Sequence, residues 1–93
     1  MTLEEGRSAI RLTTTELDGE IQADMNAVPV DLKNAGMAGV PDEALLDTAV
    51  RLYLRWQFNF CGRGEEYERA YKELKNSLAL AYAEPSAGGA TSV

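Results

Sequence analysis

Side chains that could carry catalysis are scarce in this chain of 93 residues. Histidine, the commonest general base and zinc ligand, is absent, and Cys61 is the only cysteine. A thiol triad or a zinc site would need partners that this composition does not supply. A single cysteine also forms no disulfide within the chain, which favours a reducing cytoplasm as the site of folding. We therefore expect a protein that is not an enzyme and that holds no metal and no cofactor.

Two motifs have both a functional and a structural interpretation. Gly62, Arg63 and Gly64 contain a fragment of a phosphate-binding loop, but no predicted strand precedes them and the motif is incomplete. We interpret this segment as a turn between two helices. Tyr67 and Tyr71 could stack on nucleic-acid bases, yet they lie on an apolar stripe, where tyrosines usually belong to the core.

The acidic balance of the chain limits the partners that it can bind. There are 15 Asp and Glu against 9 Lys and Arg, a formal net charge of −6. Surfaces that bind nucleic acid or anionic lipid are normally basic, so neither is an expected partner. Residues 1–36 hold seven acids and three bases. They could complement a basic neighbour, although a solvated face is the simpler interpretation. The N-terminus has no basic region followed by an apolar core, so no signal peptide is predicted.

The elements that must position these residues are helices, and the first half of the chain predicts two. Thr2 and Glu5 have the spacing of a capping box, which starts a short helix. A run of threonines breaks it, and a second helix begins with a threonine of residues 14–15 as its N-cap. Its apolar stripe continues in phase past Pro29, so we expect one kinked helix. The glycines of residues 36–39 end it.

The stretch of residues 42–60 is the one around which the fold must be organised. Its large apolar residues recur at the helical period and cover nearly the whole circumference, which predicts a helix buried on most sides. At about 19 residues it could span a bilayer by length. Five charged residues within it make that unfavourable. Pro41 suits the first helical position.

The last helix is predicted over residues 65–82, and a tail follows it. Short connections make neighbouring helices antiparallel. Residues 84–93 have no large apolar side chain before Val93, so this segment should be flexible in the free protein. The predicted fold is all-α: one small antiparallel bundle of about four helices over residues 1–83, with a flexible C-terminal tail.

The apolar stripes of these helices predict the core, and residues outside the stripes predict an interface. Leu54 and Phe58 lie away from the main stripe of the central helix, and the short first helix should be too thin to cover both. We expect them at a subunit interface, with Arg51 and Arg55 as its charge complement; burial of both within the chain is the alternative. The predicted core consists of Leu17, Ile21, Val28, Leu32, Leu45, Ala49, Leu52, Trp56, Tyr67, Tyr71, Leu74 and Leu78.

The order and spacing of these segments resemble those of a known family, the head–tail connector proteins of long-tailed bacteriophages and prophages, sometimes labelled DNA-packaging proteins. The resemblance covers residues 2–82, and it is carried by the order of the segments together, since each alone is a helix pattern. The segments are Thr-Leu-Glu-Glu at residues 2–5, Leu-Thr-Thr-Thr-Glu-Leu-Asp at 12–18, Asp-Leu-Lys-Asn-Ala-Gly-Met at 31–37, Ala-Val-Arg-Leu-Tyr at 49–53, Trp-Gln-Phe at 56–58 and Tyr-Glu-Arg-Ala-Tyr-Lys-Glu-Leu-Lys at 67–75.

The resemblance implies a structural virion protein that is made in the bacterial host cytoplasm and resides at the head–tail junction. Such proteins form a ring beneath the portal, extend the DNA channel and join the filled head to the tail. The implied partners are the portal protein, neighbouring copies in the ring, and a downstream connector or tail-completion protein. DNA would pass through without specific binding, and no membrane is involved. In such families the C-terminal segment can dock on the portal, which maps Glu84 and Pro85 to that contact. The alternative is a small acidic helical protein-binding module of the antitoxin or inhibitor type.

Overall fold

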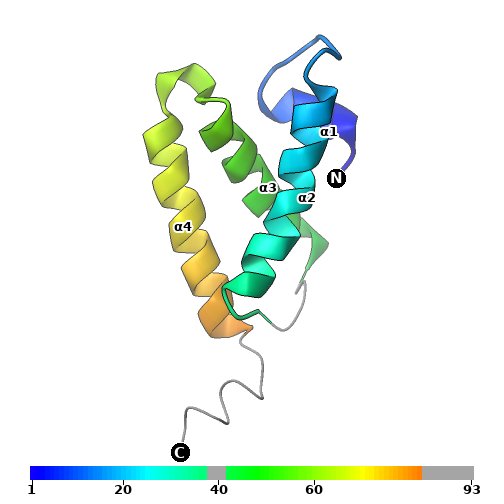
Figure 1. The fold of residues 1–93 in the computed structure, drawn as a ribbon. Helices are drawn as coiled ribbons and strands as arrows, with labels where there is room; N and C mark the ends of the chain where they lie inside the picture. Colours follow the sequence, from blue (N-terminus) through cyan, green and yellow to red (C-terminus); the bar gives the residue numbers. More distant parts are fainter. Residues whose placement is uncertain (38–41, 83–93) are drawn as a thin grey trace, which may run out of the picture.

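The computed structural model describes residues 1–37 and 42–82, and these form an all-α bundle, as predicted (Figure 1). α3 lies between α2 and α4 and runs antiparallel to both, and α1 packs beside α2 and α3. The elements are α1 (Leu3–Ala9), α2 (Asp18–Asn34), α3 (Glu43–Gln57), the short 3₁₀ turn η1 (Phe60–Gly62) and α4 (Gly64–Ala81).

The start of α1 confirms the predicted capping box. The Thr2 hydroxyl accepts a hydrogen bond from the Glu5 backbone N–H at 3.2 Å. The Glu5 carboxylate accepts one from the Thr2 backbone N–H at 3.0 Å. Two of the N–H groups at the helix start are thereby satisfied, which stabilises a helix of only seven residues.

The predicted threonine cap of α2 is wrong. The helix begins at Asp18, and the cap residue Leu17 makes no side-chain cap hydrogen bond. The Thr14 hydroxyl instead accepts from the Glu16 backbone N–H at 3.2 Å, because a local turn competes with helix capping for the same oxygen. α2 then runs through Pro29 as one helix, and Gly36, at φ +108°, follows its end as predicted. The predicted roles of Gly39 and Pro41 lie outside the described residues.

α3 begins and ends at specific side-chain contacts. The Asp42 carboxylate caps its start by accepting from the Ala44 N–H at 2.8 Å. The helix ends at Gln57, earlier than the predicted Phe60, because Asn59 takes a left-handed conformation with φ 46°. The Asn59 side-chain oxygen then accepts from the Gly64 N–H, the first of α4, at 2.8 Å. The turn interpretation of the Gly-Arg-Gly segment is thus confirmed.

The core forms where α3 meets the other helices, and its most extensive packing is with α4. Half of the predicted core is fully buried. The predicted core residues Leu17, Leu45, Leu52, Trp56, Tyr67 and Leu74 are only half-buried. Ile10, Met37, Val50 and Leu54 were not in the predicted core but lie in it. The buried core cluster comprises Ile10, Ile21, Val28, Leu32, Met37, Ala49, Val50, Leu54, Tyr71 and Leu78.

Candidate interaction surfaces

Leu54 lies in the core and not at an exposed surface, so its predicted place at an interface is wrong. Its relative exposure is 0 %, and it packs beneath α1. A Cβ built on Gly6 would lie 3.6 Å from the Leu54 Cδ1 atom, so the backbone of α1 itself covers this side chain. Phe58 is half-buried and packs against the core cluster. Although α1 is short, its backbone lies close enough to α3 to cover Leu54. The alternative, burial within the chain, is therefore correct for Leu54, and the predicted apolar patch does not form.

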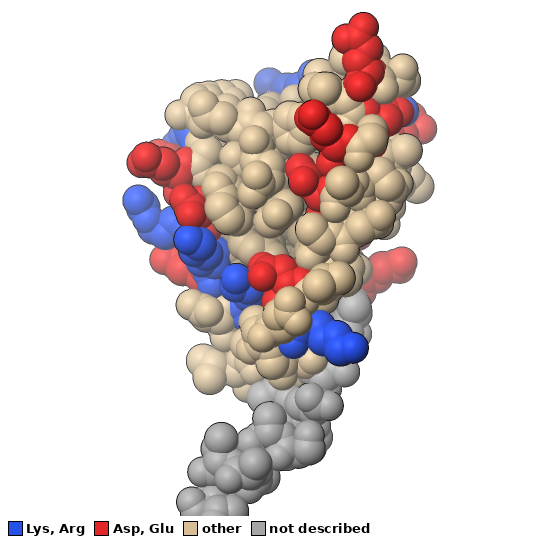
Figure 2. Space-filling model, viewed as in Figure 1, with Lys and Arg blue, Asp and Glu red and all other residues tan. Residues whose placement is uncertain are grey.

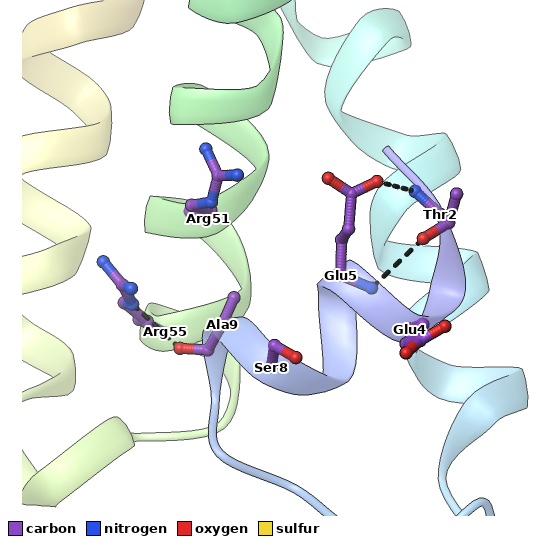
Figure 3. A pocket seen from close by; sticks show the side chains of 7 residues that line it. All are labelled: Thr2, Glu4, Glu5, Ser8, Ala9, Arg51 and Arg55. Atoms are coloured by element: carbon purple, nitrogen blue, oxygen red, sulfur yellow. Dashed lines mark hydrogen bonds between the residues drawn. The ribbon is translucent and has the colours of Figure 1, made fainter.

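Arg51 and Arg55 line a polar pocket between α1 and α3, with a volume of about 330 Å³ (Figure 3). The arginines extend from α3, and the carboxyl and hydroxyl groups opposite them come from the α1 segment. With acids on one wall and bases on the other, the pocket has no single charge preference, which makes it a poor site for a simple anion. The remaining lining residues are Thr2, Glu4, Glu5, Ser8 and Ala9.

Arg55 is a structural link, although it was predicted as an interface charge. Its Nε donates a hydrogen bond to the carbonyl oxygen of Ala9, the last residue of α1, at 3.0 Å. Its guanidinium carbon also lies 5.8 Å from the ring centroid of Phe60 and 5.9 Å from that of Tyr67. A cation that bonds a free carbonyl at a helix end satisfies an orphan acceptor and offsets the helix dipole. Arg55 therefore holds the end of α1 against α3, η1 and α4.

Arg51 is half-buried and makes no hydrogen bond or ion pair with another described residue. The positive charge of Arg51 acts on the carboxyl group of Glu5. The pKa of Glu5 lies below its ordinary value, chiefly because of hydrogen bonds with Thr2, and the positive charge of Arg51 adds to this lowering. Of the two predicted interface arginines, Arg51 is thus the one with its guanidinium still available to a partner.

A second hollow of about 450 Å³ lies between α2 and α4, and we call it the α2–α4 groove. Tyr53 and Trp56 of α3 form its floor, and Lys75 contributes from α4. Figure 2 shows this region as largely uncharged surface between the charged side chains on either side. The groove exists because α2 and α4 both pack on α3 and pack little on each other. The wall from α2 is lined by Ala27, Val30, Asp31 and Asn34.

Two hydrogen bonds join α4 to α2 beside the groove. The Tyr71 hydroxyl donates to Asp31 Oδ2 at 2.7 Å, and Lys75 Nζ donates to the same oxygen at 3.2 Å. Burial opposes ionisation of Asp31, but these two hydrogen bonds outweigh it and place the pKa of Asp31 below its ordinary value. Burial, and then the hydrogen bond to Asp31, raise the pKa of Tyr71.

The aromatic rings of the floor are in mutual contact, and this fixes their orientation. The ring centroids of Tyr53 and Trp56 are 5.4 Å apart, and those of Tyr53 and Tyr71 are 5.2 Å apart, both in edge-on arrangements. Lys72 Nζ lies 5.6 Å from the Trp56 centroid. Trp56, predicted at the centre of the core, therefore belongs to a preformed, partly exposed floor.

Three large apolar side chains of the described residues are exposed. Val30, at the groove, is 59 % exposed. Leu80 and Tyr82, at the C-terminal end of α4, are 86 % and 40 % exposed. Sequence reasoning missed all three as surface features. The available signal was that Leu80 lies off the apolar stripe that includes Leu78.

The predicted contact residues Glu84 and Pro85, together with the predicted flexible tail, lie outside the described residues. Over residues 1–37 and 42–82, no group of three or more Cys, Asp or Glu side chains has an arrangement that could hold a metal ion. Over the same ranges, no helix combines the length and the apolar character that crossing a membrane requires. Comparisons with protein-family models, with curated proteins and with solved structures find no match to this chain.

Proposed function

We propose that this chain is a structural assembly protein, a head–tail connector of a bacteriophage or prophage. In this role it forms a ring beneath the portal, extends the DNA channel and joins the filled head to the tail. The observation that carries the proposal is the α2–α4 groove, a preformed and largely apolar hollow on the surface of a small helical bundle. Exposed apolar hollows with a fixed shape usually mark sites of protein association.

The order of the helices supports the proposal. The segments on which the resemblance rests fall in sequence on the cap of α1, the connection into α2, the end of α2, the middle of α3, the end of α3, and α4. Each segment has a structural task there: for example, Thr2 and Glu5 cap α1, and Tyr71 joins α4 to Asp31.

The charge of the chain supports a channel through which DNA slides without being held. The net charge is −6, and several acids make no ion pair with another described residue. Acidic side chains facing a channel repel the phosphate backbone. The proposed partners are the portal protein, neighbouring copies of this chain and a downstream connector or tail-completion protein. The proposed location is the virion, after synthesis in the host cytoplasm.

Negative-stain electron microscopy of the purified protein, alone and mixed with purified portal, tests this function. We expect closed rings of this chain, formed either in solution or on one end of the portal. Portal imaged without the protein is the matched control, because it shows which density belongs to the added ring.

Portal particles that stay unchanged, together with a chain that binds one soluble partner in a simple ratio, would contradict the connector function. That result would favour the small acidic protein-binding module, for which the α2–α4 groove would be the binding site. Size-exclusion chromatography with light scattering distinguishes the two outcomes by the mass of the complex.

A further inference from the structure

Two apolar surfaces of this chain are exposed and differ in shape. One is concave: the α2–α4 groove, with Tyr53 and Trp56 at its floor and Val30 at its wall. The other is convex: the C-terminal end of α4, which we define as residues 76–82 and on which Leu80 is 86 % exposed. We infer that the C-terminal end of α4 in one copy of this chain binds in the α2–α4 groove of another copy.

The end of α4 is directed away from the groove of its own chain. Lys75 lines that groove, and Leu80 follows it by five residues on the same helix. Five residues correspond to a rotation of about 140° around a helix with 3.6 residues per turn. Leu80 therefore faces another side of α4, and only a second molecule can bring it to a groove.

Charge favours contact between these two surfaces over contact between other faces of the chain. Copies with a net charge of −6 repel each other wherever unpaired acids meet. The groove contains one acid, Asp31, which is already paired with Lys75 at 3.2 Å. The end of α4, Asn76 to Tyr82, contains no charged side chain. An acidic chain can therefore bring these two surfaces together with little repulsion.

The dipole of α4 adds an attraction of the right sign. Its last turn has no basic residue, so the negative end of the dipole is not offset within the helix. Lys75 lies at the groove, and Lys33 lies in the last turn of α2, which forms the groove wall. Both cations would lie near the carbonyl end of the α4 from the neighbouring copy. The contact joins two different surfaces, so it is heterologous and can close into a ring.

This inference deepens the proposed function, since it names the contact between neighbours in the ring, but contact between two copies can be measured without portal. The first experiment uses paramagnetic relaxation in NMR. The variant A81C, in a C61S background, carries a nitroxide label beside Leu80 and leaves the Leu80 side chain in place. It is mixed at millimolar concentration with isotope-labelled C61S chain. We expect selective broadening of the Trp56 indole N–H and of the Val30 amide.

The label at an exposed position near the other end of α4, E65C in the same background, is the matched control and should leave both signals sharp. Broadening that centres on residues 76–82 of the partner would mean that like surfaces meet, and it would overturn the inference. Signals that remain sharp at the groove with the A81C label would also overturn it.

A second experiment uses two charge substitutions, V30D and L80D, and sedimentation equilibrium. Both residues are exposed, so each variant should keep the helical circular dichroism of the parent chain. Each variant alone should associate at least tenfold more weakly than the parent. A mixture of the two retains one intact groove and one intact α4 end, so it should form a one-to-one heterodimer with the parental affinity. A mixture that associates no better than either variant alone would contradict a heterologous contact.

The two proposals fail in different ways. If rings form on portal and include V30D and L80D as readily as the parent chain, the connector function holds and this contact is wrong. If the groove signals of Trp56 and Val30 broaden and the heterodimer forms, but portal binds no ring, the contact holds and the connector function is wrong.

Discussion

Tyr71 has its ring in the core and its hydroxyl at the edge of the α2–α4 groove. The residue is 1 % exposed, and the hydroxyl donates to Asp31 at 2.7 Å. Burial, followed by this hydrogen bond, raises the pKa of Tyr71 above its ordinary value of 10.0. The native state therefore holds the phenol proton more tightly than the unfolded chain does.

The variant Tyr71→Phe should lower the free energy of unfolding by about 1–2 kcal/mol at neutral pH, because it removes a hydrogen bond to a carboxylate. A raised native pKa contributes stability that is complete below pH 10.0 and is lost as pH rises through the native value. The gap between the parent chain and Tyr71→Phe should therefore narrow at about pH 11, one unit above the ordinary tyrosine pKa.

Urea unfolding at both pH values measures this gap. Tyr67→Phe is the control, because the Tyr67 hydroxyl makes no side-chain hydrogen bond with another described residue, and its stability should match that of the parent. A deficit for Tyr71→Phe that stays constant with pH would contradict a native pKa of Tyr71 above its ordinary value.

Leu54 and Leu80 are the same residue type in opposite environments, with 0 % and 86 % exposure. Leu54→Ala should lower the free energy of unfolding by about 2–5 kcal/mol, since it leaves a cavity beneath α1. Leu80→Ala in the monomer should change it by no more than about 0.5 kcal/mol. Thermal melts followed by circular dichroism compare the two variants. An unchanged melting temperature for Leu54→Ala would show that Leu54 is not buried in the core.

The error over Leu54 shows what a helical projection can and cannot give. The projection correctly placed Leu54 on the side of α3 that is opposite to the main stripe. It could not show that Gly6 lets the α1 backbone approach to contact distance, because that depends on how two helices cross. The hydrogen bond of Arg55 was missed for the same reason: its partner, the Ala9 carbonyl, is 46 residues away in the chain.

At the scale of elements, the docking of α1 on α2 depends on Gly6. A Cβ added there would lie 2.9 Å from Ile21 Cγ2, closer than packed atoms tolerate, and 3.3 Å from Met25 Sδ, a tight contact. Overpacking should cost Gly6→Ala about 1–3 kcal/mol, and the roughly 1 kcal/mol that alanine gains in helix propensity offsets part of this cost, so the free energy of unfolding should fall by up to about 2 kcal/mol. Hydrogen exchange should then show α1 amides less protected.

Gly19, in the first turn of α2, provides the matched control. A Cβ there meets nothing within 4 Å, so Gly19→Ala has only the propensity gain and should be neutral or slightly stabilising. If Gly6→Ala proved as stable as Gly19→Ala, then α1 would not be seated against Ile21 as described.

Element boundaries were predictable where one side chain decides them and unpredictable where two structures compete for the same group. The capping box of Thr2 and Glu5 fixed the start of α1 from sequence alone. Thr14 could cap a helix or close a local turn, and the sequence did not distinguish the two. The end of α3 depends on Asn59, whose left-handed backbone is accompanied by its bond to Gly64, a contact with the next helix.

At the scale of the whole molecule, net charge should control self-association. Raising salt from about 0.1 M to about 1 M shortens the screening length from about 10 Å to about 3 Å, which weakens repulsion between copies that each carry a large net charge. For a chain at −6, a contact between apolar surfaces that carry little net charge should therefore tighten with salt. Sedimentation equilibrium across a salt series measures this, and weakening with salt would point to ion pairs, with Arg51 as the first candidate.

The all-α fold and the order of its helices followed from periodicity, but the groove did not. The groove exists because α2 and α4 diverge where they cross α3. The angle between these two helices cannot be deduced from the spacing of residues within either one. Trp56 illustrates the limit: its stripe position predicted a core residue, and its ring does contact Tyr71 of α4, with the ring centroids 5.9 Å apart. Whether the far side of the ring meets protein or solvent is decided by a helix elsewhere in the chain.

The position of α3 at the centre of the bundle has a consequence for how the chain is made. Ile21, Val28 and Leu32 of α2 leave the ribosome before the residues of α3 that bury them, and a lone helix of 17 residues is marginal in water. The hairpin of α3 and α4, with its short turn and the most extensive packing, can close quickly once it is complete. The bundle therefore completes its core only after α4 has been synthesised, and the hairpin of α3 and α4 organises the helices made before it.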